Sequence, residues 1–413
     1  MAERRLAIVT SRPIQYQVPL WRALAAVPGL CVRVLYATDR GAERYFDAAF
    51  GSQIRWDVPL LDGYDWKVLR NRPLRGLGWR FELRCPSIGR ELERGGYDAV
   101  LLVGKEHWYY LQAIRAALHQ GIPILYRAET PPPRRGRMQA EMAGWQRRRL
   151  FPRFASLLCV GREQRAFYRG YGVPDSRMFW APYCVDNRFF QEAARRFGPE
   201  RDRIRARWGF GRETRVVAFA AKFIDRKRPR DLIDAFARLP RDGSYGLLMA
   251  GSGPRLEACR AHAAACGLRN VAFPGFLNQS EIGAVYAAAD CFVLPSEHET
   301  WGLVVNEAMN FALPVVVSDS VGAGRDLVEE GVNGHRYPTG DVEALARALR
   351  AVLASDARRA ALGRRSRAIV DGYSVARSVA GIVEALAAAT GRARSRRFEP
   401  LAAGAAGAAP GGP

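Results

Sequence analysis

Two acidic residues eight positions apart carry the strongest chemical signal in this sequence. Glu299 and Glu307 lie in the stretch PSEHETWGLVVNEAMNFALPVVVSD, whose pattern predicts a strand end, a loop, a helix and another strand. Gly302 stands near the expected helix start, where unpaired N–H groups and the helix dipole favour a phosphate. Glu299 on the loop can accept hydrogen bonds from sugar hydroxyls, and Glu307 from another polyol such as a ribose. Surface carboxylates are common, so the prediction of a site depends on this context.

Two lysines follow another predicted strand, RVVAFA, and would balance those carboxylates. Lys222 and Lys227 place cations at the carboxyl end of that strand, where ligands bind in open α/β sheets. The bland alternative is that they are solvated cations on an arginine-rich protein. The sequence contains no D-x-D triplet, the obvious metal-chelating arrangement for a diphosphate. We therefore expect no cofactor and no metal, with lysine and helix dipole neutralising the diphosphate.

Two further strand ends carry weaker signals. Gly251 and Gly253 follow the strand YGLLMAG and would let the chain turn tightly beside a ligand, or serve as turn residues only. Phe276 and Leu277 lie in FPGFLN, which ends the next strand and could present backbone groups to a nucleobase. Because the carboxyl ends of parallel strands meet at one edge of a sheet, we expect these loops to form one site.

Short apolar runs alternate with amphipathic stretches in both halves of the chain. This rhythm predicts parallel sheets covered on both faces, and it starts afresh near residue 215. A chain of 413 residues also exceeds the usual size of a single core. We predict an α/β protein of two doubly wound domains. The predicted division is 1–190 for the first domain, 191–373 for the second, 374–391 for a last helix and 392–413 for a disordered basic, then Ala/Gly/Pro-rich tail.

The charge balance points to anionic partners without choosing among them. The 63 basic and 41 acidic residues give a net charge of +22. Residues 131–154 alone hold seven arginines against one acidic residue. This segment is either a docking face for an anionic membrane or an acidic carrier, or a solvated helix. No nucleic-acid partner is expected.

The lengths of the apolar runs predict where in the cell the protein is located. No uncharged apolar run reaches about 18 residues, and the first residues lack a signal-peptide core. The seven cysteines are scattered, with no C-x-x-C pair. We expect a cytoplasmic protein with reduced thiols, and peripheral contact at the inner membrane face stays open.

From about residue 215 to 345 the sequence closely resembles the C-terminal domain of glycosyltransferase family 4. The resemblance rests on FAAKFIDRKRP, LLMAGSGP, NVAFPGFLNQSEIGAVYAAADCFVLPS, ETWGLVVNEAM, LPVVVSDSVGAGRDLVEEGVNGHRYPTGD and the trailing helix. In the first half, RPIQYQVPLWRALA, FGSQIRWDVPLLDGY and APYCVDNRFF resemble a bacterial subgroup. The resemblance implies the GT-B fold, with two facing Rossmann-like domains, an interdomain cleft and a last helix that crosses back to the first domain.

The same resemblance implies roles at the donor site. Lys222 and Lys227 would hold the diphosphate, Glu299 the donor sugar and Glu307 the ribose, while Glu299 and both lysines act in catalysis. The expected donor-site residues are Lys222, Lys227, Gly251, Gly253, Phe276, Leu277, Glu299, Thr300, Trp301, Gly302, Leu303 and Glu307.

The first domain departs from the family where the acceptor should bind. The loop TSRPIQY lacks the usual glycine pair, and IPILYRAET carries Arg127 and Glu129 where many members have a histidine. These two residues are acceptor contacts or a structural ion pair, and Gln15 and Tyr16 are ligand contacts or a buried loop. The acceptor candidates are Gln15, Tyr16, Lys105, Glu106, His107, Arg127 and Glu129.

The function expected from the sequence is transfer of a hexosyl-type sugar, with retention, from a UDP- or GDP-sugar to an acceptor hydroxyl. The product would belong to glycan, glycolipid or natural-product biosynthesis. Two alternatives stay open: a non-catalytic nucleotide-sugar-binding protein, and a GT-B nucleotide-sugar epimerase. The intact acidic pair and lysines speak against the first of these.

Overall fold

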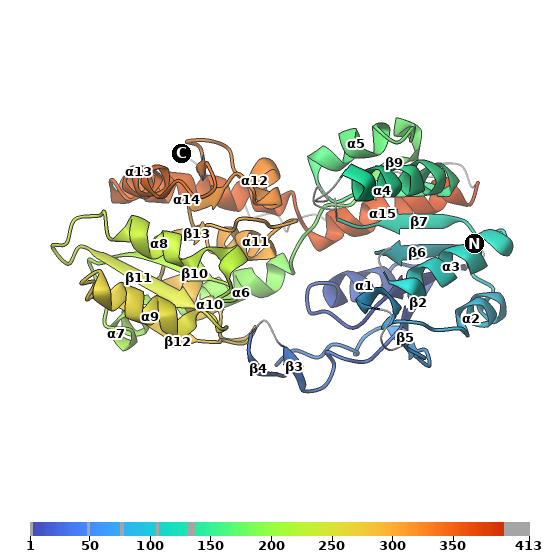
Figure 1. Cartoon of the computed structure of the whole chain (residues 1–413), viewed down its shortest axis with the longest axis horizontal. Helices are drawn as coiled ribbons and strands as arrows, with labels where there is room; N and C mark the ends of the chain where they lie inside the picture. Colours follow the sequence, from blue (N-terminus) through green and yellow to red (C-terminus); the bar gives the residue numbers. More distant parts are fainter. Residues whose placement is uncertain (1–2, 48–49, 75–77, 105–106, 130–136, 392–413) are drawn as a thin grey trace, which may run out of the picture.

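The computed structural model describes residues 3–47, 50–74, 78–104, 107–129 and 137–391 and has two α/β lobes that face each other (Figure 1). Within these residues, the first lobe contains a sheet of seven parallel strands in the order β5-β2-β1-β6-β7-β8-β9. Its strands are β1 (Arg4–Thr10), β2 (Leu30–Tyr36), β5 (Asp65–Val68), β6 (Ala99–Val103), β7 (Ile124–Arg127), β8 (Ser156–Cys159) and β9 (Met178–Trp180). Its helices are α1 (Val18–Ala25), α2 (Ile88–Gly95), α3 (Trp108–His119), α4 (Arg137–Leu150) and α5 (Arg162–Arg169).

The second lobe repeats this architecture. In the described part of the chain its sheet has six parallel strands in the order β12-β11-β10-β13-β14-β15. The strands are β10 (Arg215–Ala220), β11 (Tyr245–Ala250), β12 (Val271–Gly275), β13 (Cys291–Leu294), β14 (Val315–Ser318) and β15 (Gly334–Tyr337). The helices are α6 (Asn187–Phe197), α7 (Arg201–Arg207), α8 (Pro229–Phe236), α9 (Leu256–Ala265), α10 (Gly283–Ala288), α11 (Leu303–Asn310), α12 (Gly322–Leu327), α13 (Val342–Val352) and α14 (Asp356–Asp371). The order of strands reverses between β10 and β13, so this edge is where a doubly wound sheet binds its ligand.

Each sheet separates two hydrophobic layers. In β1, Leu6 and Ile8 belong to one cluster and Ala7 and Val9 to the other. Strand β10 alternates in the same way between two clusters of the second lobe. Strands buried on both faces must be apolar at consecutive positions, which is why runs such as AVLLV of β6 were readable in the sequence. The two doubly wound domains predicted from the sequence are confirmed.

The sequence pattern does not predict the shortest strands. Strands β3 (Tyr45–Asp47) and β4 (Ser52–Ile54) form a small antiparallel hairpin that projects from the first lobe toward the second (Figure 1). Three residues are too few to show a strand period. The tail expected at 392–413 lies outside the described residues.

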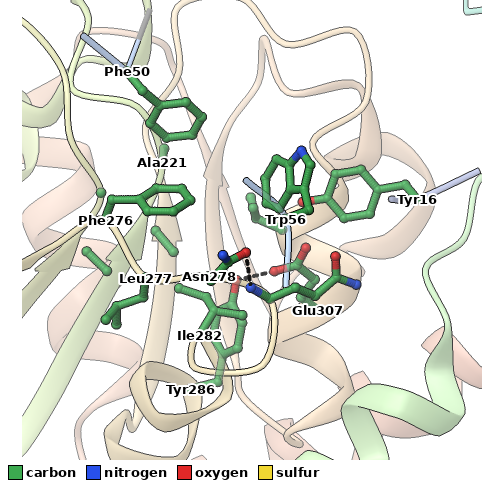
Figure 2. A pocket seen from close by; sticks show the side chains of 15 residues that line it. Tyr16, Phe50, Trp56, Ala221, Phe276, Leu277, Asn278, Ile282, Tyr286 and Glu307 are labelled. Carbon is green, nitrogen blue, oxygen red and sulfur yellow. Dashed lines mark hydrogen bonds between the residues drawn. The ribbon is translucent and has the colours of Figure 1, made fainter. Parts of the chain in front are cut away.

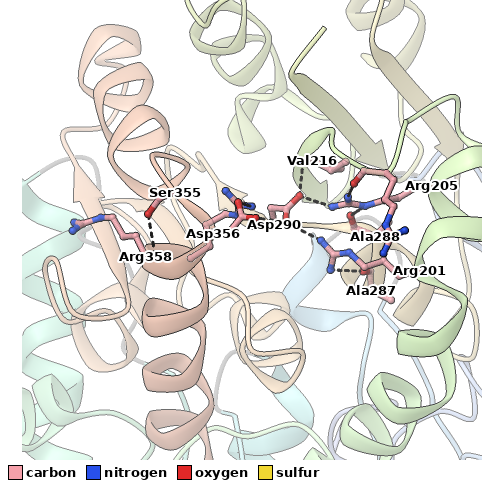
Figure 3. A network of polar contacts seen from close by, with 11 residues as sticks. Arg201, Arg205, Val216, Ala287, Ala288, Asp290, Ser355, Asp356 and Arg358 are labelled. Atoms are coloured by element: carbon pink, nitrogen blue, oxygen red, sulfur yellow. Dashed lines mark hydrogen bonds and ion pairs between the residues drawn. The ribbon is translucent and has the colours of Figure 1, made fainter.

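A buried charge network holds α7 and α14 to the amino ends of the second sheet (Figure 3). Asp290, at the start of β13, accepts hydrogen bonds from Val216 N (2.8 Å) and Arg201 (2.8 Å) and from the buried Arg205. Arg359 of α14 lies 3.5 Å from the same carboxylate. Several cations share one acceptor, so removal of Asp290 would leave buried charge uncompensated.

The chain crosses between the lobes twice, and the crossings are tied together. After β9 it enters the second lobe, and helix α15 (Val375–Ala389) returns to pack against β8, β9 and α1. Ser156 Oγ in β8 donates to Ala385 O at 3.1 Å. At the crossings Asn187 Nδ2 donates to Val370 O (3.1 Å) and Tyr373 O (3.4 Å). The last helix therefore completes the first lobe, although it follows the second in sequence.

No helix in the described ranges combines the length and the apolar character that a membrane crossing requires.

Helix α15 has no room for a side chain at Gly381, since an added Cβ would lie 1.8 Å from Trp180 O. We expect Gly381→Ala to lower the free energy of unfolding by about 1–3 kcal/mol by forcing the helix off the sheet. Urea denaturation measures this change. Gly144→Ala is the matched control, because a Cβ at Gly144 in α4 meets nothing within 4 Å. Equal stability of the two variants would contradict the packing described.

Candidate active site

A pocket opens at the carboxyl ends of β10, β11 and β12, on the side that faces the first lobe (Figure 2). It holds about 550 Å³ of empty space, open solvent included. Its walls come from both lobes. The lining residues are Tyr16, Phe50, Trp56, Ala220, Ala221, Ala250, Gly251, Phe276, Leu277, Asn278, Gln279, Ile282, Tyr286, Val304 and Glu307.

The glycines at the end of β11 are required by close backbone packing. Gly251 has φ of +132°, and an added Cβ would lie 1.9 Å from Ala221 O. Gly253 has φ of +145°, with Phe223 O at 2.6 Å from such a Cβ. Both therefore keep the β11 loop against the β10 loop, and Gly251 also lines the pocket.

The loop before α11 is fixed by backbone hydrogen bonds. Glu299 N donates to Ser320 O (3.2 Å), and Gly322 N donates to Glu299 O (2.9 Å). A Cβ at Gly322 would lie 2.2 Å from Thr300 O, so the loop sits directly on the start of α12. The Glu299 backbone is thereby held in one position.

Gly302 turns the chain from this loop into α11. Its left-handed conformation, with φ of +98°, is one that side chains rarely adopt, and a Cβ would also press on Leu294 and on the Glu299 side chain. Leu303 is the first residue of the helix. The first N–H groups of a helix have no acceptor within it, so this end can receive an anion.

Lys227 and Glu299 form an ion pair beside that helix start. Lys227, the last residue of the short 3-10 helix η5 (Asp225–Lys227), donates to Glu299 Oε2. The two side chains are only 12% and 15% exposed. Burial lowers the pKa of Lys227, while the Glu299 carboxylate opposes that shift. The cation and the carboxylate predicted from the sequence thus lie together, largely out of water.

Lys222 is paired across the lobes. Its Nζ lies 3.0 Å from both carboxylate oxygens of Asp47, at the end of β3 in the first lobe. It also lies 4.3 Å from the ring centroid of Phe50. A diphosphate at Lys222 would compete with Asp47 for the ammonium group. Nothing local in the sequence marks Asp47, because the contact spans 175 positions.

Glu307 is buried, with 4% of its surface exposed, and two tyrosines donate to its carboxylate. Tyr286 Oη lies 2.6 Å from Glu307 Oε2, and Tyr16 approaches from the first lobe (Figure 2). Burial raises the pKa of Glu307 to about 7, although both hydroxyls act to lower it. Burial is likewise the main reason that the pKa of each tyrosine is raised.

Tyr16, an acceptor candidate that could also be a donor contact, lies against Glu307 in the wall of this pocket. The neighbouring Gln15 is buried, as the alternative of a packed loop required. The signal for Tyr16 was its position in the first strand-to-helix loop, which did not tell which ligand the loop would face.

Trp301 was expected among the donor contacts, but its side chain is not in the pocket wall. It is buried, donates from Nε1 to Asn306 Oδ1 (2.9 Å) and meets the Tyr183 ring edge-on at 5.6 Å. Its indole packs on first-lobe residues, a role that a local motif could not reveal.

The first-lobe candidates lie at the carboxyl edge of their own sheet. Arg127 ends β7, is buried, and places its guanidinium 4.8 Å from the Tyr183 ring centroid. Glu129 hydrogen-bonds to Tyr183, whose pKa is raised by burial and then by that carboxylate. His107 precedes α3 and meets Trp79 edge-on at 5.1 Å. Lys105 and Glu106 lie outside the described residues.

One group of metal-type ligands occurs among the described residues, away from this pocket. Asp234 of α8 and His262 and Cys266, in and just after α9, have ligand atoms within 4.8 Å of one another. None of the three lines the pocket.

Residues 200–369 match the family described as Glycosyl transferases group 1. The D-inositol 3-phosphate glycosyltransferase of Xylanimonas cellulosilytica is 30% identical over 237 residues, which are 57% of each chain. The protein of the same name from Geodermatophilus obscurus is 33% identical over 239 residues, 55% of this chain and 51% of that one. The chain thus spans about half the length of these relatives.

Solved structures match the whole fold. A glycosyltransferase from Rickettsia africae covers 94% of this chain and 99% of its own, with a TM-score of 0.72 and 12% identity. Anabaena HepE, solved in complex with UDP and glucose, covers 93% of this chain and all of its own, with a TM-score of 0.68 and 18% identity. The two lobes therefore have the GT-B fold expected from the sequence.

The raised pKa of Glu307 gives a stability prediction. Between pH 4.5 and 7 the unfolded chain loses this proton while the folded chain keeps it, so stability falls as pH rises. Glu307→Gln should remove this loss and gain about 2–3 kcal/mol relative to wild type between pH 5 and 8. Urea unfolding at both pH values measures it. Glu297→Gln, whose side chain is 55% exposed nearby, is the control. Parallel pH profiles for wild type and Glu307→Gln would show that the carboxyl is not buried as described.

Proposed function

We propose that the protein is a retaining glycosyltransferase of bacterial type that transfers a hexosyl-type sugar from a UDP- or GDP-sugar to an acceptor hydroxyl. The observation that carries this proposal is the Lys227–Glu299 pair beside the start of α11, in the same site as the buried Glu307. The matched family and the named relatives support transfer of a sugar, and the UDP complex of HepE supports a nucleotide donor.

The donor's diphosphate would lie between the two lysines and the helix start. Charge builds on the diphosphate as the bond to the sugar breaks, and preorganised cations and N–H groups stabilise that charge. Lys227 is already held by Glu299, whereas Lys222 must exchange Asp47 for a phosphate oxygen. These groups would neutralise the diphosphate, so we propose that the reaction needs no metal.

The two carboxylates would bind different polyols. Glu299, fixed through its backbone, would accept hydrogen bonds from the transferred sugar and orient it. Glu307 would accept from the ribose hydroxyls, in the company of Tyr16 and Tyr286. Hydrogen bonds to a charged acceptor are the stronger kind, so ribose binding favours the ionised carboxylate.

The acceptor would enter from the first-lobe side, where Arg127, Glu129 and His107 lie. We propose attack on the face that the diphosphate leaves, with the leaving phosphate taking the acceptor's proton, as the family resemblance implies. Product classes remain glycan, glycolipid or natural product. Closure of the lobes would exclude water and limit hydrolysis of the donor.

Two substitutions separate binding from turnover. Glu299→Ala should lower kcat about 10²–10³-fold with little change in donor affinity, since the oriented sugar matters most in the transition state. Glu307→Ala should weaken nucleoside diphosphate binding about tenfold through lost hydrogen bonds. Donor turnover and calorimetric binding of UDP and GDP measure these effects, with Glu297→Ala as control. Unchanged kinetics in both variants would refute the site. Tight donor binding without turnover would favour a non-catalytic binding protein. Release of free nucleotide in the absence of an acceptor would favour an epimerase.

Most of the described part of the arginine-rich segment is helix α4, and this helix exposes apolar side chains. Met138, Met142 and Trp145 are 77%, 57% and 55% exposed, and their spacing places them on one helix face. Arg149 lies 4.3 Å from the Trp145 ring centroid. Apolar side chains beside arginines suit an anionic membrane surface better than a soluble carrier, so we propose peripheral contact at the cytoplasmic membrane face.

Vesicles test this contact. The protein should sediment with phosphatidylcholine vesicles containing phosphatidylglycerol, and release should increase with salt. Replacing Met138, Met142 and Trp145 together by Ser should weaken binding about tenfold or more, because about 0.8 kcal/mol is lost per buried methylene. Leu118→Ser, 38% exposed on α3, is the control. Equal sedimentation of triple variant and wild type, or capture of an acidic carrier instead, would reject the membrane proposal.

A further inference from the structure

A segment of the first lobe that runs from Phe50 to Asp57 covers part of the pocket. Phe50 O accepts a hydrogen bond from Ser252 Oγ at 3.0 Å, and Arg55 O accepts from Asn278 Nδ2 at 2.7 Å. Asp57 lies beyond, within 3.2 Å of Ser280 N. These contacts follow the loops after β11 and β12. The segment therefore covers the side of the pocket where the sequence predicted backbone contacts to a base.

Three aromatic rings meet at this cover, two of them from the first lobe. Phe50 and Phe276 are 5.1 Å apart between ring centroids at 76°, and Trp56 and Phe276 are 6.2 Å apart at 63° (Figure 2). All three line the pocket. The pairs meet edge-on, so neither first-lobe ring is stacked parallel on Phe276. Aromatic side chains such as these bind flat aromatic ligands by stacking.

A polar atom in the same wall is unsatisfied. Gln279 Oε1 is buried and has no hydrogen-bond partner among the described residues. The neighbouring Asn278 is different, because its Nδ2 donates to Arg55 O and its Oδ1 accepts from Gln279 N at 3.0 Å. Asn278 thus anchors the first-lobe segment. Buried acceptors in proteins are normally paired, so the free oxygen of Gln279 fits a ligand that brings an N–H group.

The aromatic rings lie near the groups that we propose for the diphosphate and the ribose, which is where the base of a nucleotide would be. Lys222 Nζ, proposed for the diphosphate, lies 4.3 Å from the Phe50 ring centroid. Glu307 and its two tyrosines, proposed for the ribose, line the same pocket as Trp56. A ribose and a flat base would therefore meet suitable groups within this pocket, and a phosphate would meet Lys222 beside it.

We propose that Phe50 and Trp56 of the first lobe, together with Phe276, form the wall on which the donor's nucleobase stacks, and that Gln279 Oε1 accepts a hydrogen bond from a ring N–H of that base. This inference rests on the proposed function and names the residues that would select the base of its UDP- or GDP-sugar donor. Uracil and guanine carry a ring N–H on their pairing edge, whereas cytosine and adenine present a bare ring nitrogen there. The site should therefore select uracil or guanine nucleotides over their cytosine or adenine counterparts.

Matched nucleotides test the role of Gln279. Calorimetry should show at least tenfold tighter binding of UDP than of CDP, or of GDP than of ADP, by the wild-type protein. Gln279→Leu should abolish that preference, because the acceptor is gone, while the affinity for inorganic pyrophosphate stays the same.

Trp56 is tested by affinity and by its own fluorescence. Trp56→Ala should weaken nucleoside diphosphate binding about tenfold and leave pyrophosphate binding unchanged. Binding of UDP or GDP should quench tryptophan emission, and Trp56→Phe should remove most of that quenching. Trp66→Phe, with its side chain 39% exposed on β5, is the control and should keep it.

The outcomes separate the two proposals. Wild-type protein that binds no nucleoside diphosphate overturns the proposed function and this inference together. Binding and quenching that survive in the Trp56 variants, or pyrophosphate affinity that falls in parallel, overturn the stacking wall alone. Wild-type protein that binds CDP as tightly as UDP, and ADP as tightly as GDP, overturns the assignment of Gln279.

Discussion

Two ammonium groups at the meeting of the lobes impose the main constraint on this structure. Lys222 and Lys227 must stay charged in a partly buried place, and each has its own carboxylate to compensate the lost hydration. One carboxylate, Glu299, comes from the same lobe, and the other, Asp47, comes from the opposite lobe. The local pair is therefore independent of how the lobes sit, while the second pair exists only when they are close.

Close backbone contacts hold the loops around these lysines in place. Gly251 and Gly253 let two strand-end loops touch backbone to backbone, and Gly322 lets α12 support the Glu299 loop. Such contacts fix main-chain atoms, which is what preorganised charges need in order to act without rearrangement. Glu307 is different, because burial raises its pKa to about 7 although the hydroxyls of Tyr16 and Tyr286 oppose that shift.

Local patterns in the sequence predicted the fold and the part of the candidate site that belongs to the second lobe. Consecutive apolar residues identify β1, β6 and β10, and the spacing of Glu299 and Glu307 fixed their place around the start of α11. Contacts between the lobes were not predictable in this way. Asp47 belongs to a three-residue strand, Trp301 proved to be an interlobe packing residue, and Tyr16 proved to face Glu307. Each depends on a docking geometry that leaves no periodic trace in the sequence.

The paired crossings of the chain have a mechanical meaning. Both connections run past Asn187, which bonds to Val370 and Tyr373 and accepts from Asn310 at 3.0 Å. Two covalent links held at one place form a pivot, and the hairpin of β3 and β4 meets the second lobe along a different edge (Figure 1). A swing about that pivot would stretch the hairpin side first, where the Lys222–Asp47 ion pair, several hydrogen bonds and the contacts of Phe50 and Trp56 with Phe276 connect the lobes. The lobes are thus joined covalently near Asn187, whereas at Asp47 they are joined by an ion pair that can break and form again.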